Sequence, residues 1–373
     1  MFIPVVKPIV RTILRIVSIL IFILTIFAAY GGRFTPDFFT LPSILCLTAP
    51  YLAVATLIIS ILWFIGGKWI TGGLGILSLV ASWSALAAIT PLGFSKSAEN
   101  PANTFTLLTY NIVHGIDQQQ EDAQEGNRSF EYVLHSGADI VCLQEVKDWD
   151  DPEEIPNFTR ELRDSLRAVY PYWAGATGAS DTKVLSKFPV REIRAGSLID
   201  NRFDPYCYTF YKIDVKGHPL TLVNIHFKSY NLTDEERRVV TDVKNVETAK
   251  ESVREMKGSI WSKMGEGFRK RKTDVENLRT ALRKIDGPLI VCGDFNDVPE
   301  SYSYRLLRDE GLKDAYAQTG FGPMITYNQH LFWFHIDQIF YRGGLRPLSV
   351  KKGKLKSSDH YPLTAEFEFE FNR

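Results

Sequence analysis

Four short apolar runs in this sequence each end on a polar residue that could carry chemistry. Residues 105–111, 139–145, 220–226 and 288–294 have the apolar, β-branched character of buried strands. They end on an asparagine, a glutamate, a histidine and an aspartate, respectively. Strands that present such residues at their ends predict one site at the rim of a sheet.

Two further segments strengthen this prediction. Residues 293–297 read Gly-Asp-Phe-Asn-Asp directly after a Leu-Ile-Val-Cys strand, and residues 357–362 read Ser-Ser-Asp-His-Tyr-Pro ahead of the last apolar run. A phosphate ester repels a nucleophile, so its hydrolysis needs a cation, charge-stabilising donors and an oriented water. Oxygen ligands such as those of Glu145, Asn111 and Asp359 suit Mg²⁺ or Mn²⁺. The pattern indicates hard-metal chemistry rather than structural zinc, since the sequence has no Cys/His cluster.

The order of these motifs resembles that of the endonuclease/exonuclease/phosphatase superfamily, which includes nucleases, neutral sphingomyelinases and inositol polyphosphate 5-phosphatases. The resemblance covers residues 104–373 and, together with the apolar N-terminal quarter that it does not account for, suggests a membrane-anchored, bacterial-type member. It implies a hydrolase acting on ester bonds, built as a four-layered α/β sandwich of two packed mixed β-sheets flanked by helices. The matching segments are, in order, 109–111 (TYN), 143–145 (LQE), 184–189 (VLSKFP), 224–226 (NIH), 293–296 (GDFN), 335–337 (HID) and 358–360 (SDH).

The resemblance assigns the metal and the water to specific residues. It implies Glu145 as the main ligand of Mg²⁺ or Mn²⁺, with Asn111 and Asp359 nearby. Asp294 and Asn296 would position or activate the attacking water.

The histidines and their neighbours also receive roles from the resemblance. His360 would act as general base or as a charge-stabilising donor, oriented by Asp337, because a carboxylate fixes the imidazole tautomer and raises its basicity. His226 would donate to the non-bridging phosphate oxygens, and Asn224 on the same strand face would contact the substrate. One departure is the Asp-Thr-Lys at 181–183, where many members have glycine and small residues, so Lys183 is not assigned to the site.

The N-terminal quarter has a different composition. Apolar stretches cover residues 9–30, 41–65 and 70–92, and no charged residue lies between Asp37 and Lys68 or between Lys68 and Lys96. This predicts three transmembrane helices in an anchor of residues 1–96, a linker at 97–103 and a catalytic domain at 104–373. The positively charged residues near the spans favour a cytoplasmic N-terminus, and therefore an integral protein of the cell or inner membrane with its catalytic domain outside the cytoplasm.

The remaining features narrow the possibilities. The net charge of zero argues against a broad electrostatic surface for DNA. The four cysteines have no metal-type spacing and are expected to be small buried residues. Residues 231–286 are expected to be a charged helical region, in which the basic run 269–272 is either a solvated helix face or a contact with anionic lipid or substrate. A hairpin turn is expected at Gly217.

The substrate stays open among three alternatives. A tethered nuclease is the first, because nucleases are frequent in the superfamily. A phospholipid or sphingolipid phosphodiesterase, or a lipid phosphatase, is the second, because an anchored domain meets lipid headgroups at high local concentration. The third is a catalytically idle membrane scaffold. The expected partners are a phosphate ester and the bilayer, and no protein partner is inferable.

Overall fold

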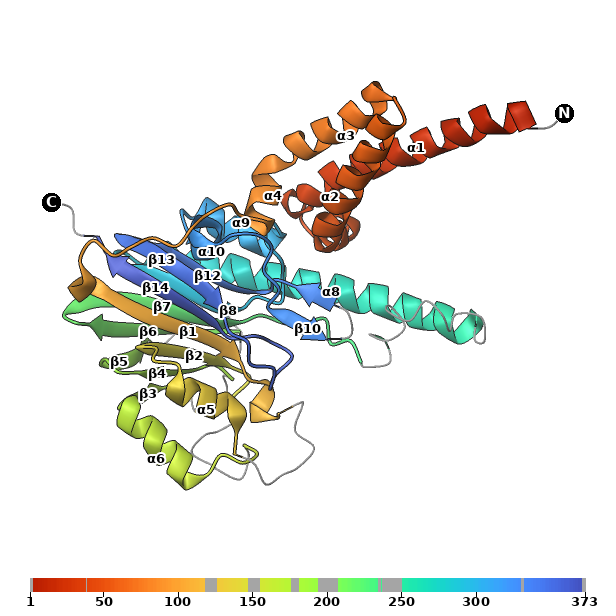
Figure 1. Cartoon of the computed structure of the whole chain (residues 1–373). Helices are drawn as coiled ribbons and strands as arrows, with labels where there is room; N and C mark the ends of the chain where they lie inside the picture. The colour runs from red at the N-terminus through yellow and green to blue at the C-terminus, as the bar shows by residue number, and fades with distance from the viewer. Residues whose placement is uncertain are drawn as a thin grey trace. The chain divides into compact units, whose positions relative to one another are not determined.

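The chain forms two compact units, each described separately below. The computed structural model describes residues 3–37, 39–117, 126–146, 155–175, 181–193, 207–233, 236, 250–329 and 332–370. The helical unit comprises Met1–Thr90 together with Val298–Arg305, and the sandwich unit comprises Pro91–Asp297 and Leu306–Arg373. Figure 1 labels most of the helices and strands of both units.

The helical unit contains the apolar stretches of the N-terminal quarter. Two of its helices are long and apolar enough to span a membrane, at Pro8–Ala29 and Leu41–Ile65. The third predicted span is a bent pair of helices, with an angle of 66° between its halves. The unit therefore has two helices that could span a membrane, or three candidate spans if the bent pair forms one span. Its elements are α1 (Ile3–Ala29), η1 (Gly31–Arg33), α2 (Leu41–Ile65), α3 (Trp69–Ala81) and α4 (Trp83–Ile89).

Small residues and hydroxyl groups hold these helices together. Thr25 and Thr56 share a buried hydrogen bond of 2.7 Å between their hydroxyl oxygens. Gly75 has no room for a side chain, since a Cβ there would lie 2.0 Å from the Ser60 hydroxyl oxygen. Apolar helices associate through such close packing where the hydrophobic effect does not drive them together. Gly32 is equally close to the Glu300 carbonyl oxygen, so residues 298–305 pack against the helices of their own unit.

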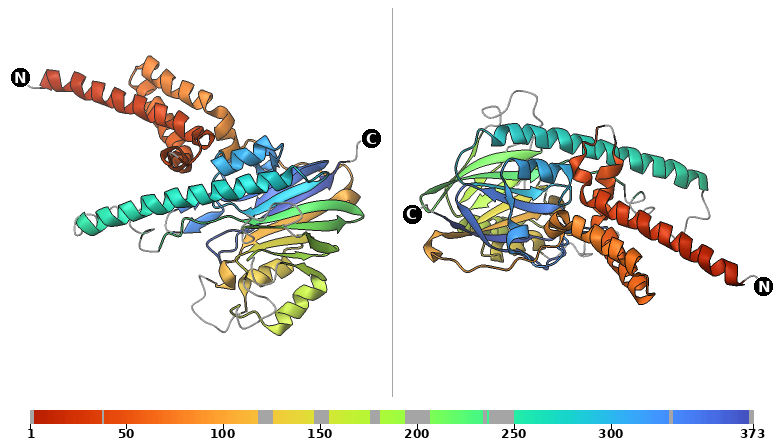
Figure 2. Two further views of the ribbon diagram at one scale, coloured as in Figure 1. Left: turned by 180° about the vertical axis from the view of Figure 1, so that it is seen from behind. Right: turned by 90° about the horizontal axis from the view of Figure 1, so that it is seen from above.

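In the described part of the chain, the sandwich unit has two six-stranded mixed sheets (Figures 1 and 2). The first sheet has the order β13-β14-β1-β2-β4-β3 and the second the order β5-β6-β7-β8-β12-β9. The strands of the first sheet are β1 (Thr104–Asn111), β2 (Ile140–Gln144), β3 (Tyr172–Ala174), β4 (Lys183–Ser186), β13 (Leu345–Lys352) and β14 (Leu363–Phe369). Those of the second are β5 (Val190–Ile193), β6 (Tyr208–Val215), β7 (His218–His226), β8 (Leu289–Asp294), β9 (Lys313–Asp314) and β12 (Asp337–Arg342).

Helices cover the outer faces of the sandwich. α5 and α6 lie on the side of the first sheet, and the long helix α8 runs along the side of the second (Figure 2). The layers are therefore helix, sheet, sheet and helix, as the resemblance implied. The remaining elements are η2 (Pro101–Asn103), η3 (Val113–Gly115), α5 (Arg128–His135), α6 (Arg160–Val169), α8 (Lys250–Leu282), α9 (Tyr302–Asp309), α10 (Ala315–Thr319), β10 (Tyr327–Gln329) and β11 (Phe332–Phe334).

Alternation along the strands builds two apolar cores. In β1, Leu107 packs between the sheets with Cys142 and Cys292, whereas its neighbour Leu108 faces α5 together with Val141 and Phe130. Successive side chains of a strand point to opposite faces, so each central strand contributes to both cores. All four cysteines are buried, as predicted, and none is in a disulfide bond.

The predicted hairpin and part of the predicted helical region are confirmed. Gly217 and Lys216 both have positive φ angles in the turn between β6 and β7, as a two-residue hairpin turn requires. α8 covers the second half of the charged region, while residues 234–235 and 237–249 lie outside the described part of the chain.

Strand direction brings the polar strand ends to one edge. β1 runs parallel to β2, and β7 runs parallel to β8, so the carboxyl ends within each pair coincide. β12 runs antiparallel to β8 and begins at Asp337, directly opposite Asp294. β14 runs antiparallel to β1, so the segment that leads into it also lies at this edge. The topology therefore gathers residues from distant parts of the chain at one edge.

Candidate active site

Two histidines at this edge are each held by an aspartate. His360 Nδ1 lies 2.8 Å from Asp337 Oδ2, and His226 Nδ1 lies 2.7 Å from Asp181 Oδ2. A carboxylate at Nδ1 fixes the imidazole so that Nε2 points away from the aspartate. Both rings therefore present Nε2 to the space between them.

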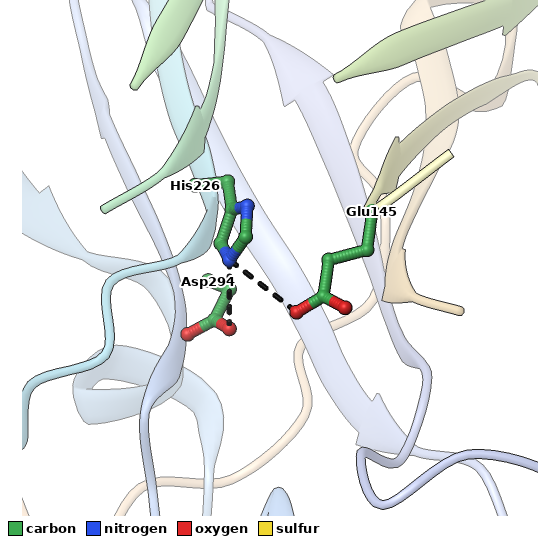
Figure 3. A group of neighbouring side chains, drawn as sticks. All are labelled: Glu145, His226 and Asp294. Carbon is green, nitrogen blue, oxygen red and sulfur yellow. Dashed lines mark ion pairs between the residues drawn. The ribbon is translucent and has the colours of Figure 1, made fainter. Parts of the chain in front are cut away.

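Asp294 lies in that space. Its Oδ2 is 3.6 Å from His360 Nε2 and 3.9 Å from His226 Nε2. The Asp294 side chain is only 1% exposed, so its charge depends on these neighbours rather than on water. Figure 3 shows the arrangement of Asp294, His226 and Glu145, with His226 Nε2 between the two carboxylates.

Glu145 approaches from the end of β2. Its Oε1 is 3.5 Å from His226 Nε2. The residue has a φ angle of 53°, which is sparsely populated for a side chain of this size and is typical of residues fixed by a site. Asn111 joins the two carboxylates, because its Nδ2 donates to Glu145 Oε1 and to Asp294 Oδ2, each at 3.0 Å. Its Oδ1 accepts the Val113 amide at 3.1 Å.

Asn296 fixes Asp294 from the other side. Its backbone amide donates to Asp294 Oδ1 at 2.7 Å, and its Nδ2 donates to the Phe227 carbonyl oxygen at 2.8 Å. Asn296 also has a positive φ of 49°. The loops that follow β7 and β8 are thus joined beside Asp294.

Asp359 lies at the margin of the site, next to His360 in the chain. Its Oδ1 is 3.9 Å from His360 Nε2 and 3.4 Å from the Ser358 hydroxyl oxygen. The Ser358 hydroxyl donates to the Asn111 carbonyl oxygen, which ties this segment to the end of β1.

The electrostatic environment shifts three pKa values in the site. Burial raises the pKa of Asp294 to about 6, although the neighbouring imidazoles oppose that shift. Burial would lower the pKa of His226, but Asp181 above all, with Asp294 and Glu145, raises it to about 9. The pKa of His360 also lies well above its ordinary value, because the effects of Asp337, Asp294 and Asp359 outweigh that of burial.

Asn224 differs from its predicted role as a substrate contact. It is fully buried, and its Nδ2 donates to the carbonyl oxygens of Leu143 and Lys183, each at 3.0 Å. Its Oδ1 accepts from Gln144 Nε2 at 2.6 Å. The side chain therefore cross-links the two sheets beneath the site, and its amide groups are occupied by protein.

Two residues of the site escaped the sequence prediction. Asp181 stands where the sequence departs from the family pattern, and only its contact with His226 reveals its role. His114 lies with Nε2 3.7 Å from Glu145 Oε2 and with 41% of its side chain exposed. A histidine three residues after a strand end gives no signal in the sequence by itself. In the structure, Val113 and His114 both have positive φ angles, and the turn that they form brings His114 to Glu145.

Arg271 of α8 supports the site from behind. It belongs to the basic run 269–272, and the expectation of a fully solvated helix face is wrong here because Arg271 is completely buried. Its Nη1 donates to the Lys228 carbonyl oxygen at 2.8 Å, and its Nε lies 3.6 Å from Asp297 Oδ2. Its guanidinium also lies over the Tyr230 ring, 4.3 Å from the centroid. Arg271 thus joins the loops that follow His226 and Asp294.

The donor set fits a hard divalent cation. Glu145, His226 and Asp294 form one group in which one ligand atom from each residue lies within 4.8 Å of the others, and Asp294, Asp337 and His360 form a second. Converging carboxylates that lie partly out of water favour a cation among them, and carboxylate oxygens favour Mg²⁺ or Mn²⁺ over softer metals.

Comparison with known proteins agrees with the fold. The model of the endonuclease/exonuclease/phosphatase family matches residues 108–360, so the chain belongs to this family. Its members hydrolyse phosphoester bonds and typically depend on a divalent metal. No curated protein matches the chain.

Solved structures that are similar to this chain are distant in sequence. The catalytic domain of human Nocturnin with a bound sulfate is 20% identical, with a TM-score of 0.46 and coverage of 72% of this chain and 94% of that one. An endonuclease/exonuclease/phosphatase protein from Beutenbergia cavernae is 15% identical, with a TM-score of 0.44 and coverage of 72% of each chain. Truncated Caenorhabditis elegans TDP2 is 18% identical, with a TM-score of 0.42 and coverage of 72% and 98%.

Proposed function

We propose that this protein is a membrane-anchored, divalent-metal-dependent phosphodiesterase that uses water as its nucleophile. The observation that carries this proposal is the convergence of two carboxylate-held histidines on Asp294, with the Glu145 carboxylate beside them. A phosphate ester placed there would meet donors for its oxygens and an acceptor for the proton of a water.

Glu145 would hold the cation, with Asp359 as a further ligand that the family resemblance implies. A bound Mg²⁺ or Mn²⁺ supplies Lewis-acid stabilisation of the charge on the phosphoryl oxygens. Asn111 offers its amide hydrogens to Glu145 and its oxygen to Val113, so its contribution is to orient Glu145 toward the cation. This proposal differs from the sequence-based prediction, in which Asn111 itself supplies an oxygen ligand to the metal.

Asp294 is the group we assign to the attacking water. Asn296 and Asn111 hold its carboxylate in place, and a pKa of about 6 suits a general base near neutral pH. His360 and His226 then act as donors to the phosphoryl oxygens, because each has its Nδ1 on an aspartate and a pKa above its ordinary value.

Nucleic acid is the first substrate class that we propose, in keeping with the nucleases of the superfamily. The helices Pro8–Ala29 and Leu41–Ile65 favour a second class, phosphodiesters of lipid headgroups, because a domain tethered to a bilayer meets them at high effective concentration. The excess of positive residues at one side of the spans supports a catalytic domain outside the cytoplasm.

The test uses the full chain in liposomes, since residues 298–305 pack with the helices. Hydrolysis of bis-p-nitrophenyl phosphate, p-nitrophenyl phosphate, plasmid DNA and a phospholipid panel would be measured with Mg²⁺, with Mn²⁺ and with EDTA. Glu145→Gln and His360→Gln are expected to lower turnover by a factor of about 100 or more. The matched controls Glu276→Gln on α8, a half-buried residue, and His135→Gln on α5, an exposed one, are expected to retain it.

Each result has a defined meaning. Metal-dependent DNA cleavage that both site variants lose supports the tethered nuclease, and turnover of lipid alone moves the assignment to the lipid phosphodiesterases. Turnover of the monoester alone makes the protein a phosphatase. Absence of metal-dependent turnover on every substrate contradicts the proposal and favours the catalytically idle scaffold.

A further inference from the structure

Three apolar side chains form an exposed patch at one edge of the sandwich unit. Leu92, Phe94 and Phe321 are 57%, 71% and 66% exposed, respectively. The rings of Phe94 and Phe321 stack with their centroids 5.6 Å apart and their planes at 27°. Leu92 forms a β-bridge with Phe321, so the three residues make one surface, here called the aromatic patch.

The segment that bears the patch is fixed to the sandwich. The Gly322 amide donates to the Pro91 carbonyl oxygen at 2.8 Å, and the Lys96 amide donates to the Leu348 carbonyl oxygen at 2.7 Å. At Gly93 a Cβ would lie 2.9 Å from the Gln318 carbonyl oxygen, so the backbone there passes directly against the end of α10. These contacts fix the backbone around the patch, so the two phenylalanines stay at the surface.

The chain itself limits where the patch can lie. α4 ends at Ile89, and it is the second half of the bent pair that is apolar enough to cross a membrane. An extended chain advances at most about 3.6 Å per residue, so Leu92 lies within about 11 Å of Ile89 and Phe94 within about 18 Å. If the bent pair spans a bilayer, these residues cannot leave the region of its headgroups.

The chemistry of the patch suits that region. Aromatic side chains concentrate at the membrane–water interface, where their rings contact acyl chains near the headgroups. Lys96, two residues after Phe94, is also exposed, and its ammonium group can bind anionic headgroups beside the same segment. An exposed cluster of this kind, left in water, would be an unexplained apolar surface.

We propose that Leu92, Phe94 and Phe321 insert into the interface of a phospholipid bilayer and hold the sandwich unit against the membrane. The patch adjoins α10, which packs on β12 and β13 at one edge of the sandwich. The opposite edge, at β3 and β5, then faces away from the lipid. This contact goes beyond tethering by the helices, because it fixes which side of the catalytic unit meets the bilayer.

The experiment exploits the four buried cysteines, which leave the surface without a native thiol among the described residues. The full chain carrying Phe321→Cys is labelled with a nitroxide and placed in liposomes of phosphatidylcholine and phosphatidylglycerol. The collision rates with oxygen, which enters lipid, and with a neutral nickel chelate, which stays in water, are compared by electron paramagnetic resonance. Tyr172→Cys on β3 is the matched control, since Tyr172 is an exposed aromatic residue at the opposite edge.

The label at position 321 is expected to favour oxygen over the nickel chelate several-fold more than the label at position 172. A second label, introduced by Phe94→Cys, guards against local disturbance at position 321. Immersion of either label supports the proposal, and exposure of both to water at the level of the Tyr172 control overturns it. Spin–spin broadening that disappears on dilution with unlabelled protein also overturns it, because the patch would then bind a second copy of the chain. The inference rests on the membrane anchoring in the proposed function, but none of these readouts requires catalytic activity, so their failure is distinguishable from failure of the proposed phosphodiesterase activity.

Discussion

The two histidine–aspartate pairs beside Asp294 share the same hydrogen bond but lie in different environments. The Nδ1–Oδ2 distance is 2.8 Å for His360–Asp337 and 2.7 Å for His226–Asp181. In the first pair the side chains are 5% and 2% exposed, whereas in the second they are 16% and 34% exposed. The pairs therefore differ in their access to water.

This difference shows how much of a residue's role burial decides. Water cannot replace the partner of a buried charged group, so the loss of Asp337 would leave His360 without compensation. Water can reach Asp181 and replace part of its interaction with His226. We therefore expect the His360 pair to be the rigid one and the His226 pair to be the tolerant one.

The largest effect is expected when each aspartate loses its charge. Asp337→Asn should lower kcat by about 100-fold and Asp181→Asn by about 10-fold or less, because only the first leaves a buried imidazole without a carboxylate. Rates would be measured with the full chain, bis-p-nitrophenyl phosphate and Mg²⁺. Asp214→Asn, at an exposed position of β6, is the matched control and should be silent. Equal losses in the two site variants would show that burial does not distinguish the pairs.

A smaller effect is expected at Arg271, which supports the loops after β7 and β8. Arg271→Lys keeps the charge but cannot contact the Lys228 carbonyl and Asp297 together, so kcat should fall by about 10-fold. The double variant with Arg271→Lys and Asp181→Asn should lose less kcat than the product of the two single losses, because both changes remove support from His226. In the double variant with Arg271→Lys and Asp337→Asn, the two losses in kcat should multiply.

The exposed neighbour Arg269 provides the control, since Arg269→Lys should leave kcat unchanged. If the losses in kcat multiply in both double variants, Arg271 does not act through His226.

The smallest effect is expected in the pH dependence of stability without metal. A histidine whose folded pKa is raised stabilises the fold fully below its unfolded pKa of about 6.5 and loses this contribution as the pH rises through the folded value. For His226 the window is pH 6.5 to about 9, and the contribution is at most about 3 kcal/mol at 1.36 kcal/mol per pKa unit. His360 extends the loss in the same direction.

Melting temperatures of the full chain in EDTA should therefore fall between pH 6.5 and 9. The fall should be smaller in Asp181→Asn and in Asp337→Asn, each of which removes the partner of one histidine. A melting temperature that is constant across this range in the wild-type chain would show that neither histidine has a folded pKa above its unfolded value.

Residue order and spacing were enough to predict much of this protein. The four strand ends that present Asn111, Glu145, His226 and Asp294, and the two apolar helices, follow from periodicity and composition, because burial of one or both faces leaves a repeated pattern. The family and the layered fold follow from the motifs. The fourfold division of the sandwich into layers could be inferred only through the resemblance.

Other features depend on contacts between residues that are distant in the chain. Asp181 meets His226 from 45 residues away, Arg271 is buried although it sits in a run of four basic residues, and Asn224 is occupied by carbonyl groups of two neighbouring strands. The bend between α3 and α4 likewise has no counterpart in hydropathy, which averages over it.

The sequence by itself determined which residue types are available, which segments are apolar and in what order the motifs occur. The tertiary structure decided which carboxylate holds which histidine, which basic residue is withdrawn from water and which apolar side chains remain exposed. The reason is physical: composition and periodicity are local properties of the chain, whereas partners, burial and pKa values arise only when the parallel and antiparallel strands bring their ends to the same edge.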